Sequence, residues 1–219
     1  MTRTIASWLG SLSLVAAVLI TTPTPALAGP PLICHPFDIG TARSLPFGDT
    51  SEGWRGWNAT APSYDRARLV ADTLALLTPT TPVIVRMETL RRASAYAAES
   101  PALASALLAA LEARAPKVAR TKAEGLALFD AGYLVETYRQ LGDRGVAMKV
   151  SLQGKDGYAM VRAAMAQAPD DAALHFAAAL MTTAPDKKAA HLQHLAKARQ
   201  GARADTLLAR NLTTHDMAE

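Results

Sequence analysis

Three small groups of residues have side chains that could do chemistry, and the first contains the only cysteine of the chain. Cys34 is followed by His35 and then by Asp38. A thiolate nucleophile needs a base within hydrogen-bond reach and a third group that orients this base, and neighbouring sequence positions do not provide that geometry. Haem attachment requires the motif C-x-x-C-H, of which only the last two residues occur here. We assign no catalytic residue and retain Cys34 and His35 as candidate cofactor-binding residues, with a buried inert thiol as the favoured alternative.

The second group is a set of histidines in the C-terminal half. His191 and His194 are three positions apart, so they share one face of a predicted helix. The turn near 184–185 brings His175, on the preceding helix, to the same height as His194. Three converging imidazoles would be a ligand set for zinc, nickel or copper, although no fourth ligand occurs at a fixed spacing. The alternative is a set of histidines that bind no metal, and no cofactor other than such a transition metal is expected.

The third group is the cluster Arg86, Arg91 and Arg92 on one predicted helix. Guanidinium groups can hold carboxylates or phosphates in bidentate fashion, so the cluster is a candidate binding site. The alternative is a solvated helix face whose arginines pair with neighbours such as Glu88.

Charge and motifs limit the classes of function. The chain has 23 Lys and Arg against 19 Asp and Glu, which gives a formal net charge of +4 without a basic block. So small an excess does not indicate a nucleic-acid partner or an anionic membrane surface. The sequence contains no glycine-rich phosphate loop, serine nucleophile elbow or zinc-protease helix motif. It therefore favours a protein without catalytic activity, although it does not decide the question.

The elements that must position these groups are predominantly helices. Apolar residues spaced by three and four predict helices over 65–77, 82–99, 101 to the break at 116, 121–141, 157–168, 171–183, 186–201 and 204–212. Ser100 before Pro101 is a favoured helix start, and Thr121 with Glu124 forms a capping box. Residues 146–155 alternate apolar and polar side chains, but a lone strand would have no partner, so we expect a loop.

The segment 29–63 is expected to form an ordered but irregular arm. Proline and glycine recur along it, which disfavours helix. It nevertheless carries many large apolar side chains, including Trp54 and Trp57, and a flexible linker would not. We expect the arm to pack across the helices, and we add these two tryptophans to the three arginines as candidate binding residues.

The first 28 residues have the layout of a secretory signal. Arg3 precedes an apolar run over 5–20, and residues 26–28 form an A-x-A cleavage site. The run is shorter than the roughly 20 residues that a membrane span needs. We expect cleavage after Ala28 and a periplasmic or secreted bacterial protein without an integral membrane span. Its single helical domain would cover 64–219.

Two stretches resemble known patterns. Residues 157–212 are similar to a degenerate tetratricopeptide repeat if Pro169 is the proline near the end of the second helix of the repeat. The small-residue positions are then taken by Ala164, Ala178, Ala179 and Ala198. His175 stands where an aromatic residue is usual, and Arg203 where the next proline would be. The stretch PLICHPFDIG at 31–40 resembles the start of an uncharacterised family of exported bacterial proteins. The first resemblance implies stacked helix pairs and the second a periplasmic setting; neither implies an activity.

The sequence thus predicts an all-α protein of stacked antiparallel helix pairs in a solenoid-like array, with the irregular arm packed across it. Such arrays expose a concave surface. The leading hypothesis is therefore an exported protein-interaction or scaffold protein that holds a protein or peptide partner. The alternative is a periplasmic metal- or cofactor-binding protein that uses the three histidines, or Cys34 and His35.

Overall fold

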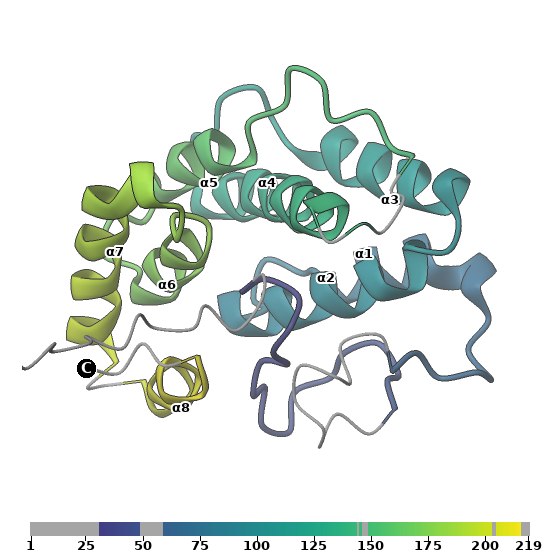
Figure 1. Cartoon of the computed structure of the whole chain (residues 1–219), viewed down its shortest axis with the longest axis horizontal. Helices are drawn as coiled ribbons and strands as arrows, with labels where there is room; N and C mark the ends of the chain where they lie inside the picture. Colours follow the sequence, from purple (N-terminus) through teal and green to yellow (C-terminus); the bar gives the residue numbers. More distant parts are fainter. Residues whose placement is uncertain (1–30, 49–58, 144, 146–148, 203–204, 216–219) are drawn as a thin grey trace, which may run out of the picture.

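The protein folds into a set of packed α-helices (Figure 1). The computed structural model describes residues 31–48, 59–143, 145, 149–202 and 205–215. Its α-helices are α1 (Leu69–Leu76), α2 (Val83–Ala97), α3 (Pro101–Arg114), α4 (Lys122–Asp143), α5 (Gly157–Met165), α6 (Ala172–Leu180), α7 (Lys188–Gly201) and α8 (Thr206–Thr214). The short 3-10 helices η2 (Arg66–Arg68) and η3 (Pro185–Lys187) precede α1 and α7.

The all-α fold is confirmed for the described part of the chain. Its only extended pairing is an isolated antiparallel bridge between Phe47 and Thr60, and residues 149–156 form no regular element. No helix among these residues is long and apolar enough to cross a membrane. The expected signal segment 1–28 and the tryptophans Trp54 and Trp57 lie outside the described residues.

Local sequence signals explain where the helices begin. The Ser100 side chain accepts a hydrogen bond from the backbone N–H of Leu103 at the start of α3, with Pro101 in the first turn. At α4, the Thr121 hydroxyl accepts from the N–H of Glu124, and the Glu124 carboxylate accepts from the N–H of Thr121. These bonds confirm the predicted cap and capping box. Asp156, Asp171 and Asp205 cap α5, α6 and α8 in the same way.

Helix α2 is the centre of the domain (Figure 1). It packs against α1, α3, α4 and α6, and every one of its residues except Arg92 is buried. A surface helix buries a single stripe, so burial all round marks α2 as a core helix. Consecutive helices also pair, α4 with α5 and α6 with α7. Because α2 also contacts the distant α6, the packing is not purely between neighbours as it is in a simple solenoid. The tetratricopeptide-like repeat remains a prediction.

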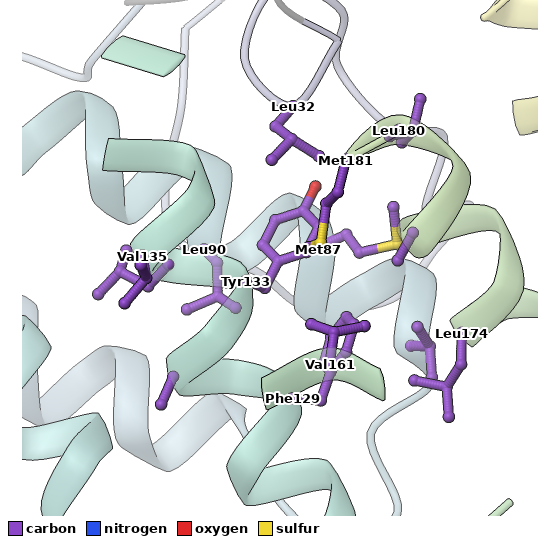
Figure 2. Close-up of a cluster of buried hydrophobic side chains, with 14 of the residues drawn as sticks. Leu32, Met87, Leu90, Phe129, Tyr133, Val135, Val161, Leu174, Leu180 and Met181 are labelled. Atoms are coloured by element: carbon purple, nitrogen blue, oxygen red, sulfur yellow. The ribbon is translucent and has the colours of Figure 1, made fainter. Parts of the chain in front are cut away.

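The hydrophobic core is continuous from the arm to the C-terminal helices. Figure 2 shows Leu32 of the arm beside side chains from α2, α4, α5 and α6. The labelled residues of that cluster, all less than a tenth exposed, are Leu32, Met87, Leu90, Phe129, Tyr133, Val135, Val161, Leu174, Leu180 and Met181. Each such side chain contributes roughly 1.5–3 kcal/mol by leaving water. The described part of the arm is therefore a component of the core.

The close approach of α4 and α5 depends on two glycines. A Cβ atom added to Gly132 would lie 2.7 Å from the Gly157 carbonyl oxygen and 2.8 Å from the Met160 Cβ. A Cβ atom on Gly157 would likewise collide with the Gly132 carbonyl oxygen. Since backbone atoms cannot move aside as a flexible side chain can, the two helices touch backbone to backbone at this point.

We expect the substitution Gly132→Ala to destabilise the protein. Overpacking at a rigid contact costs about 1–3 kcal/mol, which exceeds the gain of up to about 1 kcal/mol from the better helix propensity of alanine. Urea unfolding followed by circular dichroism measures the difference. Gly142→Ala is the matched control, because a Cβ atom at Gly142 on the same helix would meet nothing within 4 Å. Equal stability of the two variants would contradict the close contact.

The arm is fixed to α2 by a row of polar side chains. Thr89, Arg92 and Tyr96 lie on one face of the helix, at positions i, i+3 and i+7. In the same order they bond three consecutive residues of the arm. The hydroxyls of Thr89 and Ser44 are 3.0 Å apart. The Arg92 guanidinium donates to the Leu45 carbonyl at 2.7 Å, and the Tyr96 hydroxyl donates to the Pro46 carbonyl at 2.6 Å. The expected ordered, irregular arm is confirmed over 31–48.

Candidate functional site

A cleft of about 770 Å³ lies where the arm passes the first two helices. We call it the arm cleft. Arm residues 42–46 form one wall, and Tyr64, α1 and the connection from α1 to α2 form the other. Its lining residues are Ala42, Arg43, Ser44, Leu45, Pro46, Tyr64, Arg68, Asp72, Ala75, Leu76, Thr78, Thr81, Pro82 and Val85. A helix rises 1.5 Å per residue, so the stretch from Arg68 to Leu76 gives the cleft a length of about 12 Å.

Polar groups line one side of this cleft. Tyr64, Arg68 and Asp72 are spaced by four residues; the Tyr64 hydroxyl donates to Asp72 Oδ2 at 2.9 Å, and Arg68 donates to Asp72 Oδ1 at 3.2 Å. Burial, together with the hydrogen bond to Asp72, raises the pKa of Tyr64 well above its ordinary value, so this phenol stays protonated and remains a donor. Asp72 is thus already engaged on both carboxylate oxygens.

Arg43 is the free cation of the cleft. Its side chain is exposed, and within the described part of the chain it has no ion-pair partner. Arg43 and Arg68 outweigh Asp72, so the lining carries a net positive charge. The rest of the lining combines the hydroxyl groups of Ser44, Thr78 and Thr81 with apolar side chains such as Pro46, Ala75 and Leu76. Such a surface suits a ligand with both carboxylates and apolar groups.

Behind the helical wall lies a buried ion pair. Arg86 donates to Asp130 Oδ2 of α4 at 2.6 Å, to the Thr81 carbonyl at 3.0 Å and to the Thr78 carbonyl. Both threonines line the arm cleft. Burial raises the pKa of Asp130 to about 6, although the neighbouring Arg86 charge acts in the opposite direction. Arg86 thus connects the cleft wall to a carboxylate that titrates near neutral pH.

The arginine cluster expected from the sequence is inside the protein. The solvated-face interpretation is wrong for Arg86 and Arg91, which are 1% and 0% exposed, because carboxylates are buried with them. The predicted pairing with Glu88 is confirmed: its two oxygens accept from Arg91 at 2.7 and 2.8 Å and from Arg92 at 2.7 Å. In these positions, Arg86 and Arg91 bind carboxylates of the chain itself rather than an external anion.

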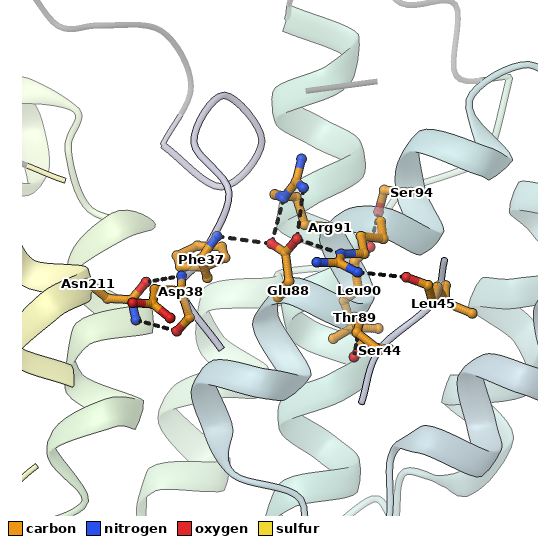
Figure 3. A network of polar contacts seen from close by, with 11 residues as sticks. Phe37, Asp38, Ser44, Leu45, Glu88, Thr89, Leu90, Arg91, Ser94 and Asn211 are labelled. Atoms are coloured by element: carbon orange, nitrogen blue, oxygen red, sulfur yellow. Dashed lines mark hydrogen bonds and ion pairs between the residues drawn. The ribbon is translucent and has the colours of Figure 1, made fainter. Parts of the chain in front are cut away.

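Glu88 also holds the arm (Figure 3). Its Oε2 accepts from the backbone N–H of Phe37 at 3.0 Å. Burial alone would raise the pKa of Glu88, but the hydrogen bonds and charges of Arg91 and Arg92 keep it below its ordinary value. The carboxylate therefore stays charged, and four donors converge on it.

Two of the three candidate histidines come together. His175 Nδ1 and His194 Nδ1 are 3.0 Å apart. His175 Nε2 lies 2.9 Å from the Pro169 carbonyl, which can only accept, so this nitrogen carries the proton. His194 Nε2 lies 2.8 Å from the Tyr158 hydroxyl. The two imidazoles and the Tyr158 hydroxyl thus form one continuous hydrogen-bonded chain.

His191 does not join this chain by any described hydrogen bond. Its Nδ1 lies 2.9 Å from the Ala179 carbonyl. Burial, followed by the nearby His175 and Lys197, lowers the pKa of His194 to about 4. The described residues contain no group of three or more His, Cys, Asp or Glu side chains that could hold a metal ion. The nitrogen atoms of the histidine pair are used by protein partners.

The Cys34 group is also engaged with other parts of the fold. Cys34 is buried, and His35 makes an edge-to-face contact with His215. The carboxylate of Asp38 accepts from the Gly40 N–H at 2.8 Å and pairs with Arg210 at 2.6 Å. Asp38 is therefore occupied by partners other than His35, and its contacts do not orient that imidazole as a base.

No family model matches this chain. No curated protein and no solved structure is significantly similar to it either. The geometry of the arm cleft and of the groups around it is therefore what bears on function.

The polar residues of the cleft were not among the candidate residues predicted from the sequence. The four-residue spacing of Tyr64, Arg68 and Asp72 is a signal that could have identified one wall. Asp130 is a second missed signal, because it is a lone carboxylate between the apolar residues 128–129 and 131 of a predicted helix. No such spacing marks Arg43 in the sequence, because its position in the cleft depends on how the irregular arm folds back over α2.

Proposed function

We propose that this chain is an exported binding protein that holds a short acidic segment of a partner protein in the arm cleft. The observation that carries this proposal is that the exposed Arg43 and Arg68 line one cleft together with apolar side chains. Buried carboxylates neutralise Arg86 and Arg91, whereas Arg43 has no such partner among the described residues. A carboxylate of a ligand would complete this site.

The dimensions of the cleft favour a peptide. Its volume of about 770 Å³ is in the usual range of about 300–1,000 Å³ for ligand sites. An extended chain advances about 3.3 Å per residue, so a length of about 12 Å accommodates three or four residues. Alternate side chains of an extended segment point to opposite sides, which lets carboxylates reach Arg43 while apolar groups contact Pro46 and Leu76.

Export is part of the proposal on the basis of the N-terminal sequence. The apolar run over 5–20 and the A-x-A site at 26–28 support it. A metal-binding function has less support, because a metal ion would have to replace the hydrogen bond between His175 and His194. We therefore retain only peptide binding.

Reversal of the charge at Arg43 tests the site. We expect Arg43→Glu to weaken binding of a rhodamine-labelled tetrapeptide of alternating glutamate and leucine by about tenfold, since a favourable charge contact becomes a repulsive one. Fluorescence anisotropy at low ionic strength measures the dissociation constant. A lysine–leucine peptide of the same length should bind more weakly than the acidic peptide to the natural protein.

Arg120→Glu is the matched control. Arg120 is exposed and does not line the arm cleft, and its substitution changes the net charge by the same amount. We expect this variant to keep the affinity of the natural protein within about twofold. Equal losses in the two variants would show that only the overall charge matters and would contradict binding in the arm cleft.

A further inference from the structure

Within the described structure, Arg86 bonds both Asp130 and the wall of the cleft, and Asp130 is the one acid group linked to the wall in this way. The Arg86 guanidinium lies between them, bonded to Asp130 on one side and to the carbonyls of Thr78 and Thr81 on the other. Asp130 is 1% exposed, and its charge is therefore poorly screened by water. Any anion that enters the arm cleft adds negative charge near this carboxylate.

The two oxygens of Asp130 have different surroundings. Oδ2 accepts from Arg86, whereas Oδ1 is buried and has no hydrogen-bond partner among the described residues. A proton can therefore be added at Oδ1 while the bond between Oδ2 and Arg86 remains. Burial brings the pKa of Asp130 to about 6, so this proton is exchanged in a physiological range.

The charged groups that face Asp130 come from two helices. They are Arg86 of α2 and Arg114 of α3, which also donates to the Leu77 carbonyl. The other helix packed on α4 is α5. Among the described residues, the charges that act on the pKa of Asp130 are those of Arg86 and Arg114, and no group of α5 is among them.

We propose that the arm cleft binds acidic ligands together with a proton, which Asp130 takes up at Oδ1. This inference rests on the proposed function. Before binding, the negative charge of Asp130 cancels the positive charge of Arg86. Once Asp130 is protonated and neutral, the Arg86 charge adds to the charges of Arg43 and Arg68. The ligand thus favours the protonated form of Asp130, and by reciprocity a lower pH favours the ligand.

The pH dependence of peptide binding tests this coupling. We expect the natural protein to bind the glutamate–leucine tetrapeptide about fivefold to tenfold more tightly at pH 5.5 than at pH 7.5, because the charge of the buried Asp130 is poorly screened by water. Glutamate side chains of the peptide stay ionised over this range. D130N should bind with nearly the same affinity at both pH values, because its side chain is neutral throughout.

The control is D186N, which removes an exposed carboxylate on η3 and should keep the pH dependence of the natural protein. A D130N variant with the natural pH dependence would overturn the inference, since another group would then take up the proton. A natural protein whose affinity is equal at both pH values would overturn it too and leave peptide binding intact. No binding at either pH would instead overturn the proposed function.

A second measurement does not depend on any variant. Calorimetric titration of the natural protein with the same peptide at pH 6.5, in two buffers with different ionisation enthalpies, gives the number of protons taken up. We expect a fraction of one proton per peptide. An uptake of zero, with binding observed, would overturn the coupling.

Discussion

Glu88→Ala is expected to lower the free energy of unfolding by about 3–5 kcal/mol, the usual cost of removing one member of a buried ion pair. The substitution leaves Arg91, which is 0% exposed, without the carboxylate that accepts two of its hydrogen bonds. It also removes the acceptor of the Phe37 N–H. Both the core around α2 and the attachment of the arm should weaken. Denaturant unfolding measures the first effect, and limited proteolysis within 31–48 measures the second.

A surface ion pair provides the comparison for this prediction. Glu99 pairs with Arg66, and their side chains are 64% and 39% exposed. Glu99→Ala should cost less than about 1 kcal/mol, because an exposed pair contributes little. If the two glutamate variants were equally stable, the Glu88 network would have no special role in holding the arm on α2.

Local signals made the helix starts predictable. The capping bonds of Ser100 and Thr121 depend on residues three positions away, so sequence spacing was sufficient to find them. The turn between their helices predicted that His175 and His194 lie at the same height, but only the packing of the two helices brings the imidazoles into contact. His191 shares a face with His194 in the sequence pattern, yet its imidazole reaches the backbone of α6 at Ala179 instead.

Burial of the arginines could not be predicted in the same way. Three closely spaced arginines on a helix favour a solvated face unless anions are buried with them. Glu88 is local to Arg91, but Asp130 is 44 positions from Arg86, and their contact exists only after α4 packs on α2. The arm cleft likewise depends on contacts between distant parts of the chain, because Arg43 and Arg68 line it together only when the arm has been fixed to α2.

The binding proposal and the stability of the core are connected through α2. The face that carries Thr89, Arg92 and Tyr96 fixes the arm wall of the cleft, and the Arg86 side chain supports the helical wall. Substitutions that loosen α2 should therefore weaken peptide binding even where they touch no ligand. For this reason, the variants chosen for the binding tests change exposed side chains or replace a buried carboxylate with its neutral isostere.

Acidification from pH 6.5 to pH 4 is expected to destabilise the protein through His194. The fold keeps this imidazole neutral and lowers its pKa to about 4, whereas the unfolded chain takes up the proton near pH 6.5. The unfolded state therefore binds more protons in this interval, and stability falls as the pH falls, by about 3 kcal/mol for this group. His215, whose pKa burial lowers to about 3, acts in the same direction. Asp130 acts in the opposite direction, because its raised pKa makes protonation favour the folded state between about pH 6 and 3.8.

The contribution of His194 is isolated by comparing pH profiles of stability. His194→Gln lacks the titrating group, so its free energy of unfolding should fall less steeply between pH 6.5 and pH 4 than that of the natural protein, while the effects of His215 and Asp130 remain in both. His191→Gln, on the same helix, removes one of the lesser charges that act on His194 and should change the slope less than His194→Gln does. Thermal unfolding at closely spaced pH values measures these slopes. Parallel profiles for the natural protein and His194→Gln would mean that the fold does not hold the His194 imidazole neutral.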